Sequence, residues 1–185
     1  MAEPVETGPM LAVFASDKGP GDPERSSMMS QAGSYFAKRG GRIVCLAEAG
    51  NIPVPMITAA RAAGGNVRVV ADLGTVLPPA LLDVPLETLS SAPERLARIA
   101  ALADVLVALP GSLASTTALF GAWSAASAAS RPLPVVMLNR HKAYEVVRGF
   151  AGDVLSHAMS GSDKHVQFSD TIEDLWTRAS RLAIR

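Results

Sequence analysis

One segment limits the possible folds more than any other: the apolar run 105–109, which Pro110 and Gly111 end and an alanine-rich helix follows. A short apolar run with β-branched residues is typical of a strand buried on both faces of a parallel sheet. The first amide groups of the helix that Ser112 opens lack internal acceptors and lie at the positive end of its dipole. Small residues here also let a ligand approach the backbone. The segment predicts an anion site, most naturally for phosphate.

Strand-like and helix-like segments alternate along the rest of the chain. Asp22 with Pro23, and Ser91 with Glu94, are typical helix starts. Asp170 with Glu173 is expected to cap the last helix. The expected strands are 10–15, 42–46, 67–70, 105–109, 134–138 and 166–168, and the expected helices are 23–39, 53–63, 91–103, 112–129, 144–158 and 170–184.

This alternation has no internal repeat, so it predicts an open, doubly wound α/β sheet, mostly parallel and flanked by helices. Residues 71–89 lack a clear period and are expected to form a surface excursion, and 161–164 a loop. A length of 185 residues fits one domain over 10–185, preceded by a flexible segment, 1–9.

The overall charge is balanced, with 17 lysines and arginines against 17 aspartates and glutamates. Without a basic run there is little electrostatic reason to expect nucleic acid or an anionic membrane as a partner. The acidic start has no signal-peptide pattern, and no apolar stretch reaches the roughly 20 residues of a membrane helix. A single cysteine, Cys45, lies in an expected core strand. We therefore expect a cytoplasmic protein.

Several kinds of chemistry lack support in the sequence. The three histidines share no metal-ligand spacing with one another or with Cys45, so no metal site is predicted. The motifs G-x-x-x-x-G-K-[ST], G-x-G-x-x-G and G-x-S-x-G are absent, which argues against simple nucleotide triphosphatase, dehydrogenase and serine hydrolase functions. We expect no cofactor.

In a doubly wound sheet, ligands bind beyond the carboxyl ends of the strands, near the point where strand order reverses. The loops that follow the expected strands therefore supply the candidates. The residues expected to bind a small phosphorylated ligand are Ser16, Asp17, Gly50, Pro110, Gly111, Ser112, Ala114, Ser115, Thr116 and Asn139.

The order of these motifs resembles the LOG (Lonely Guy) family, also described as possible lysine decarboxylases. This Rossmann-like family includes cytokinin nucleotide phosphoribohydrolases and molybdenum-cofactor carrier proteins. The resemblance runs from about Met10 to Leu182. The matching segments are Phe14 to Ser16 with Gly21-Asp22-Pro23, Ala-Ala-Gly-Gly before 67–70, Ala-Asp-Val-Leu-Val-Ala-Leu-Pro-Gly, Pro-Val-Val-Met-Leu-Asn and the closing Val-Gln-Phe-Ser-Asp-Thr-Ile-Glu-Asp-Leu.

The family signature is P-G-G-x-G-T-x-x-E, in which glycines hold the nucleotide phosphate and the glutamate takes part in glycosidic cleavage. This chain keeps Pro110 and Gly111, but Ser112, Ala114 and Ser115 replace the other glycines and the threonine. Ala118 stands where the glutamate is expected. Alanine can neither stabilise a sugar cation nor activate water, so the resemblance implies a degenerate member that binds without hydrolysis.

Two further family features are altered. The resemblance places the family's catalytic arginine at Arg95, which could hold a phosphate or carboxylate bidentately. The glycine-rich second loop is reduced to Leu46-Ala47-Glu48-Ala49-Gly50-Asn51, in which Glu48 is expected to cap or solvate the loop or to supply a replacement carboxylate.

Three functions follow, in order of preference. The first is a LOG-like protein that binds a nucleotide or another phosphorylated small molecule without the family hydrolysis. The second is a nucleoside 5'-monophosphate phosphoribohydrolase that uses Arg95 with a relocated carboxylate, Glu48 or Asp17. The third is a structural or regulatory homo-oligomer. Because family members pair through the helix at 113–129, the resemblance also implies a homodimer.

Overall fold

The computed structural model describes residues 8–16, 23–155 and 165–184, and within them the strands form one parallel sheet in the order β4-β3-β2-β1-β5-β6-β7. Each neighbouring pair is parallel. The predicted doubly wound α/β fold is therefore confirmed. The strands are β1 (Met10–Phe14), β2 (Arg42–Ala47), β3 (Val67–Ala71), β4 (Leu86–Thr88), β5 (Val105–Ala108), β6 (Val135–Leu138) and β7 (Val166–Ser169).

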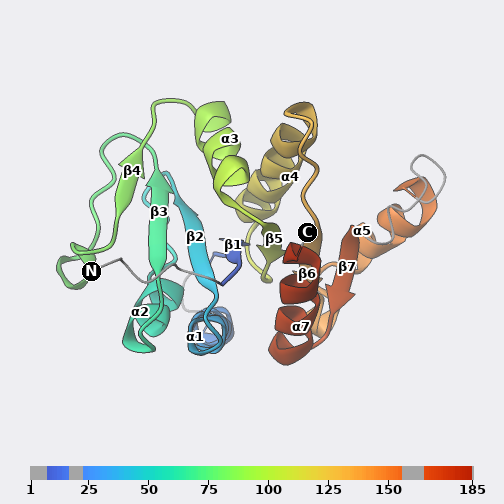
Figure 1. The fold of residues 1–185 in the computed structure, drawn as a ribbon, viewed down its shortest axis with the longest axis horizontal. Helices are drawn as coiled ribbons and strands as arrows, with labels where there is room; N and C mark the ends of the chain where they lie inside the picture. Colours follow the sequence, from blue (N-terminus) through green and yellow to red (C-terminus); the bar gives the residue numbers. More distant parts are fainter. Residues whose placement is uncertain (1–7, 17–22, 156–164, 185) are drawn as a thin grey trace.

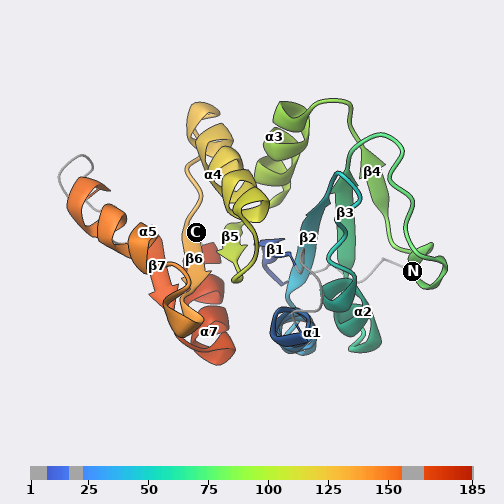
Figure 2. The same cartoon turned by 180° about the vertical axis from the view of Figure 1, so that it is seen from behind.

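Helices cover both faces of this sheet (Figure 1). One layer contains α1, α2 and α7, and the opposite layer contains α3 and α4. The view from behind shows the same two layers, with α5 extending past the edge strand β7 (Figure 2). The helices are α1 (Pro23–Lys38), α2 (Val54–Ala62), α3 (Ala92–Leu102), α4 (Leu113–Ala128), α5 (Glu145–Phe150) and α7 (Ile172–Ala183), and shorter helical turns cover Pro79–Leu81, Arg140–Lys142 and Ala151–Leu155.

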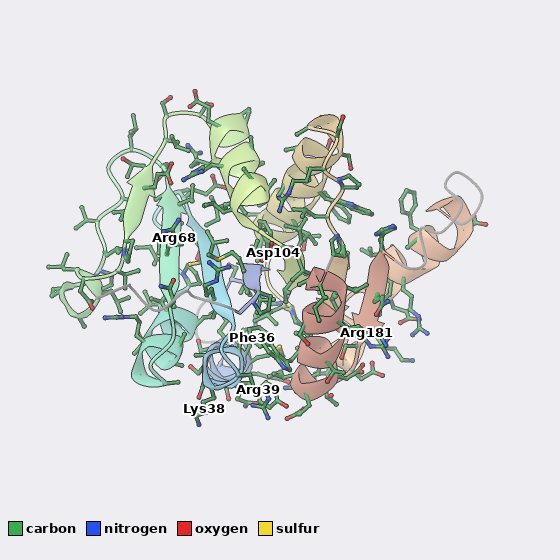
Figure 3. All side chains as sticks on the ribbon, viewed as in Figure 1. Phe36, Lys38, Arg39, Arg68, Asp104 and Arg181 are labelled. Atoms are coloured by element: carbon green, nitrogen blue, oxygen red, sulfur yellow. The ribbon has the colours of Figure 1, made fainter. Side chains whose placement is uncertain are left out.

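The sheet has an apolar core on each face, because alternate side chains of a strand point to opposite sides. Leu11 and Val13 of β1 pack toward the layer of α1, α2 and α7, whereas Ala12 and Phe14 pack toward α3 and α4. Figure 3 shows Phe36 on the side of α1 that faces the sheet and Lys38 on the outer side. All side chains of β5 and β6 are buried, as expected for central parallel strands.

The strand order reverses between β1 and β5. From β1 the chain adds β2, β3 and β4 on one side, and then returns to place β5 on the other side of β1. The loops at the carboxyl ends of β1 and β5 therefore diverge to opposite faces of the sheet and leave a crevice. In this fold, that crevice is the expected ligand position.

Several local predictions are confirmed. Helix α1 begins at Pro23, and α3 begins after a capping box in which Ser91 and Glu94 bind each other's backbone amides. Cys45 is buried in β2, and this burial raises the pKa of its thiol to about 12. Among the described helices, none has the length and apolarity to cross a membrane.

Three predictions are wrong in detail. Residues 71–89 contain β4, whose three-residue length is too short to show a strand period. The side chain that caps α7 is Thr171, which accepts from the Asp174 amide at 3.1 Å, and not Asp170. The helix predicted over 144–158 is α5 followed by a wider turn, Ala151–Leu155. The predicted loop at 161–164 lies outside the described residues.

Candidate functional site

A cavity of about 190 Å³ lies in the crevice, at the carboxyl ends of β1 and β2. Strand residues form its floor, and α3 and α4 each contribute side chains from the same face of the sheet. The lining residues are Val13, Phe14, Ala15, Leu46, Glu48, Ala49, Asn51, Asp72, Arg95, Ala114, Ser115 and Ala118. Two more open hollows, between α1 and α2 and along β7, have volumes near 700 and 430 Å³, but neither lies where the strand order reverses.

The first turn of α4 forms one wall of the cavity. Ser112 is its N-cap: its Oγ accepts from the Ser115 amide at 3.2 Å, and Ser115 Oγ accepts from the Ser112 amide at 3.0 Å. The amides of Leu113 and Ala114 have no acceptor among the described residues. Two donors at the positive end of the α4 dipole are therefore available beside the cavity.

Gly111 allows this turn to pack against the end of β1. A Cβ atom at Gly111 would lie 2.5 Å from Ser115 Oγ and 3.1 Å from the Ser16 amide nitrogen. Any larger residue would push into the capping box of α4. Gly111 therefore keeps the α4 start close to the β1 loop.

Arg95 forms the opposite wall, and its guanidinium is paired. Its Nε and Nη2 atoms donate to Glu48 Oε2 at 3.1 and 3.0 Å, and Nη1 donates to the Leu89 carbonyl at 3.0 Å. The side chain of Arg95 is 9% exposed and that of Glu48 is 33% exposed. Burial of a guanidinium is favourable only with such partners, so Glu48 compensates the charge of Arg95.

The loop after β2 fixes the position of Glu48. Ala49 and Gly50 have φ values of 53° and 73°, which turn the chain tightly enough for Glu48 to pair with Asn51 as an isolated bridge. Asn51 also donates from Nδ2 to the Oγ of buried Ser16 at 3.1 Å. This contact joins the loop after β2 to the loop after β1.

Asp72, directly after β3, holds the same loop from the other side. Its Oδ2 accepts from the Ala49 amide at 2.8 Å, and its Oδ1 accepts from the Thr75 hydroxyl. These two hydrogen bonds, with a smaller effect from the charge of Arg95, lower the pKa of Asp72 below its ordinary value. The cavity lining therefore contains two carboxylates, Glu48 and Asp72, and one guanidinium.

The sequence-predicted residues divide into four groups, of which Asn139 forms the last. Arg95, Ala114 and Ser115 line the cavity. Ser16, Gly50, Pro110, Gly111, Ser112 and Thr116 belong to the surrounding loops or the α4 start, and Thr116 Oγ1 donates to the Ser112 carbonyl at 3.1 Å. Asp17 lies outside the described residues.

Asn139 has a different environment, because its side chain holds the loop after β6. Its Nδ2 donates to Glu145 at 2.9 Å and its Oδ1 accepts from the Tyr144 amide at 2.7 Å. The Tyr144 hydroxyl in turn donates to the Leu109 carbonyl at 2.6 Å, and burial raises the pKa of Tyr144 to about 12. Asn139 thereby braces the end of β5 and is not among the residues that line the cavity.

Sequence reasoning missed Asp72 as a site residue. The available signal was an aspartate immediately after a short apolar run, which places it at the carboxyl edge of a parallel sheet. We expected residues 71–89 to form a surface excursion, whereas Ala71 is the last residue of β3 and Asp72 follows it directly. Among the described residues, no cluster of histidine, cysteine, aspartate and glutamate could hold a metal ion.

Solved structures with the same fold include proteins of different function. The molybdenum cofactor carrier protein of Chlamydomonas reinhardtii is 20% identical, with a TM-score of 0.70 over 96% of this chain and 99% of that chain. The molybdenum cofactor binding protein of Rippkaea orientalis is 15% identical, with a TM-score of 0.54 over 90% of this chain and 92% of that chain.

DNA processing protein A of Helicobacter pylori, which binds single-stranded DNA, is 14% identical, with a TM-score of 0.55 over 93% of this chain and 80% of that chain. No protein-family model matches this sequence, and no curated protein sequence matches it. At these identities the comparisons establish a Rossmann-like fold. The ligand must therefore be argued from the cavity.

Proposed function

We propose that this chain is a LOG-like protein that binds a nucleotide or another phosphorylated small molecule in the cavity between α3 and α4. The observation that carries the proposal is the position of the α4 start: Ala114, whose amide is unpaired, lines a cavity at the strand-order reversal, and the unpaired Leu113 amide precedes it in the same turn. A phosphate there would accept from these amides, as anions commonly do at helix N-termini. The likeness to molybdenum cofactor carrier and binding proteins supports a small ligand.

We also propose that this protein does not hydrolyse its ligand in the manner of the family's phosphoribohydrolases. Ala118 is 6% exposed and lines the cavity, at the position where the family signature has glutamate. Its methyl group cannot stabilise the oxocarbenium-like transition state of N-glycosidic cleavage. Binding is therefore expected without release of a free base.

Calorimetric titration of the purified protein with ribose 5-phosphate and AMP tests the binding proposal, and chromatography of the AMP mixture tests for released adenine. Saturable binding of either compound without adenine is the expected result. The absence of saturable binding of both compounds would refute the proposal. Inorganic sulfate serves as the control for nonspecific anion binding.

A second candidate is a phosphoribohydrolase with a relocated carboxylate. It is favoured by Glu48, whose carboxylate lines the same cavity as Ala118 and is held by Arg95. In that case, the wild-type protein would release adenine from AMP, and Glu48→Gln would abolish the release. Unchanged release in Glu48→Gln would exclude Glu48 as the relocated group.

We further propose a homodimer that pairs through the outer face of α4, which leaves a regulatory or structural role open as a third function. Leu113 is 84% exposed, and Phe120 and Trp123 lie partly exposed with ring centroids 6.2 Å apart. The small residues of α4 permit close helix packing. Light scattering at micromolar concentration is expected to give twice the chain mass, and a monomer would contradict this proposal.

A further inference from the structure

Glu48 is held in place by contacts on both sides. Arg95 donates two hydrogen bonds to its Oε2 atom, and the Asp72 carboxylate holds the amide of the next residue, Ala49. The Oε1 atom of Glu48 has no hydrogen-bond partner among the described residues. The result is a positioned carboxylate with one oxygen available to a ligand.

This geometry changes the chemical character of the wall that Arg95 forms. A guanidinium with its fork open would attract an anionic oxygen, but here Glu48 occupies the Nε and Nη2 donors and Leu89 occupies Nη1. The described lining carries the charges of Glu48, Asp72 and Arg95, so its formal sum is negative. Three of the five guanidinium N–H donors are thus engaged, and the negative sum makes this end of the cavity a better hydrogen-bond acceptor than anion receptor.

We infer that Glu48 is the specificity-determining residue of the cavity and selects a phosphorylated ligand whose base carries an exocyclic amino group, with Arg95 as its positioning residue. The inference rests on the proposed function, in which the phosphate binds at the start of α4. The amino group donates to Glu48 Oε1 at the opposite wall. The ligand thus places its negative charge near the α4 amides and its N–H donor near the carboxylate.

Two pairs of nucleotides test this selection, because each pair differs only in one amino group. AMP is compared with purine riboside 5'-monophosphate, and GMP is compared with IMP, by calorimetric titration of the wild-type protein. In at least one pair the amino-bearing nucleotide is expected to bind about tenfold more tightly or better, as a hydrogen bond to a charged acceptor implies. Equal affinities within both pairs would overturn the inference without any variant.

Glu48→Gln then removes the charge while keeping an oxygen that can accept from Arg95. The outward amide group becomes a donor, so the preference for the amino-bearing nucleotide is expected to disappear or reverse. Affinity for ribose 5-phosphate is expected to stay equal or rise, since a negative charge has left the cavity. Persistence of the original preference in Glu48→Gln would overturn the assignment to Glu48.

Glu87→Gln is the matched control. Glu87 accepts from Nε of Arg98, also on α3, at 3.0 Å, but neither residue lines the cavity. This variant should keep the nucleotide preference of the wild type. If it loses the preference as Glu48→Gln does, a general electrostatic effect explains the result and the inference fails.

Ribose 5-phosphate separates the failure of this inference from failure of the proposed function. If it binds and the nucleotide pairs do not discriminate, only the role of Glu48 is refuted. If neither it nor any nucleotide binds, the proposed function is refuted and the inference is refuted with it.

Discussion

The guanidinium of Arg95 and the carboxylate of Glu48 meet at one wall of the cavity through two donors and one acceptor atom: Nε and Nη2 lie 3.1 and 3.0 Å from Oε2. The pair joins α3 to the loop after β2, and the two residues are 47 positions apart in sequence. A neighbouring pair, Arg98 and Glu87, has similar distances but lies at the surface, with side chains 41% and 42% exposed. The two pairs therefore allow a direct comparison of partly buried and exposed ion pairs.

Arg95→Ala is expected to destabilise the protein by about 2 kcal/mol, because it leaves Glu48 and the Leu89 carbonyl without a buried donor. Arg98→Ala should cost less than about 1 kcal/mol, since exposed pairs gain little over solvation. Urea unfolding of both variants measures the two losses in free energy of unfolding. The slope of this free energy against urea concentration is expected to stay unchanged. Equal losses would contradict the distinction between the pairs.

Gly111→Ala is expected to destabilise the protein by about 1 kcal/mol, in the range of a lost helix cap. The added methyl group would lie 2.5 Å from Ser115 Oγ and displace it from the Ser112 amide. Gly149→Ala in α5 is the control, because a Cβ atom there meets nothing within 4 Å. That variant should be neutral or slightly more stable in thermal unfolding, and a comparable loss in both would count against the cap explanation.

Ala114→Asp separates helix stability from ligand binding. A carboxylate in the first turn of α4 should stabilise the helix by about 0.3–1 kcal/mol through its dipole. The same charge faces the cavity, so affinity for ribose 5-phosphate should fall by about tenfold or more. Thr117→Asp is the control: it places the same charge on α4 at an exposed residue outside the lining, so the affinity of this variant should fall much less. An unchanged affinity in Ala114→Asp would place the phosphate elsewhere.

Asp72→Asn tests the carboxylate that holds the Glu48 loop. Because hydrogen bonds from Thr75 and Ala49 lower the folded-state pKa of Asp72 below its ordinary value of 3.8, its stabilising contribution is present above that value. The contribution is lost as pH falls through the lowered folded pKa. The difference in melting temperature between wild type and Asp72→Asn should therefore shrink as pH falls from neutrality to below 3.8, and a constant difference would show that Asp72 acts through packing alone.

Much of this fold was readable from local sequence signals. The apolar runs of β1, β2 and β5 each predict a buried parallel strand, since only a strand buried on both faces needs no polar alternation. The Ser91 and Glu94 capping box set the start of α3 to the residue, because both partners lie within one turn. The three-residue β4 was not readable, because its pairing with β3 depends on a neighbour and not on its own period.

The candidate site was readable only in part. The start of α4 and the small residue Ala118 are local features of the chain, and the structure places both beside the cavity. The partners of Arg95 were not predictable, because Glu48 and Leu89 reach it from other loops. The role of Asp72 was hidden for the same reason, since it acts on the backbone of Ala49.

The sequence by itself therefore determined the strands other than β4, the main helices and the small-residue turn at Pro110, because hydrophobic patterning, capping and turn formation act over a few residues. Only the tertiary structure decided what charge the cavity presents. That charge depends on Arg95, Glu48 and Asp72, which follow different strands and meet only when parallel pairing brings the carboxyl ends of β2 and β3 beside α3. Such pairing joins residues that are far apart in sequence, so it forms only in the assembled sheet. Arg95, which was expected to bind an anion, therefore holds the Glu48 carboxylate instead.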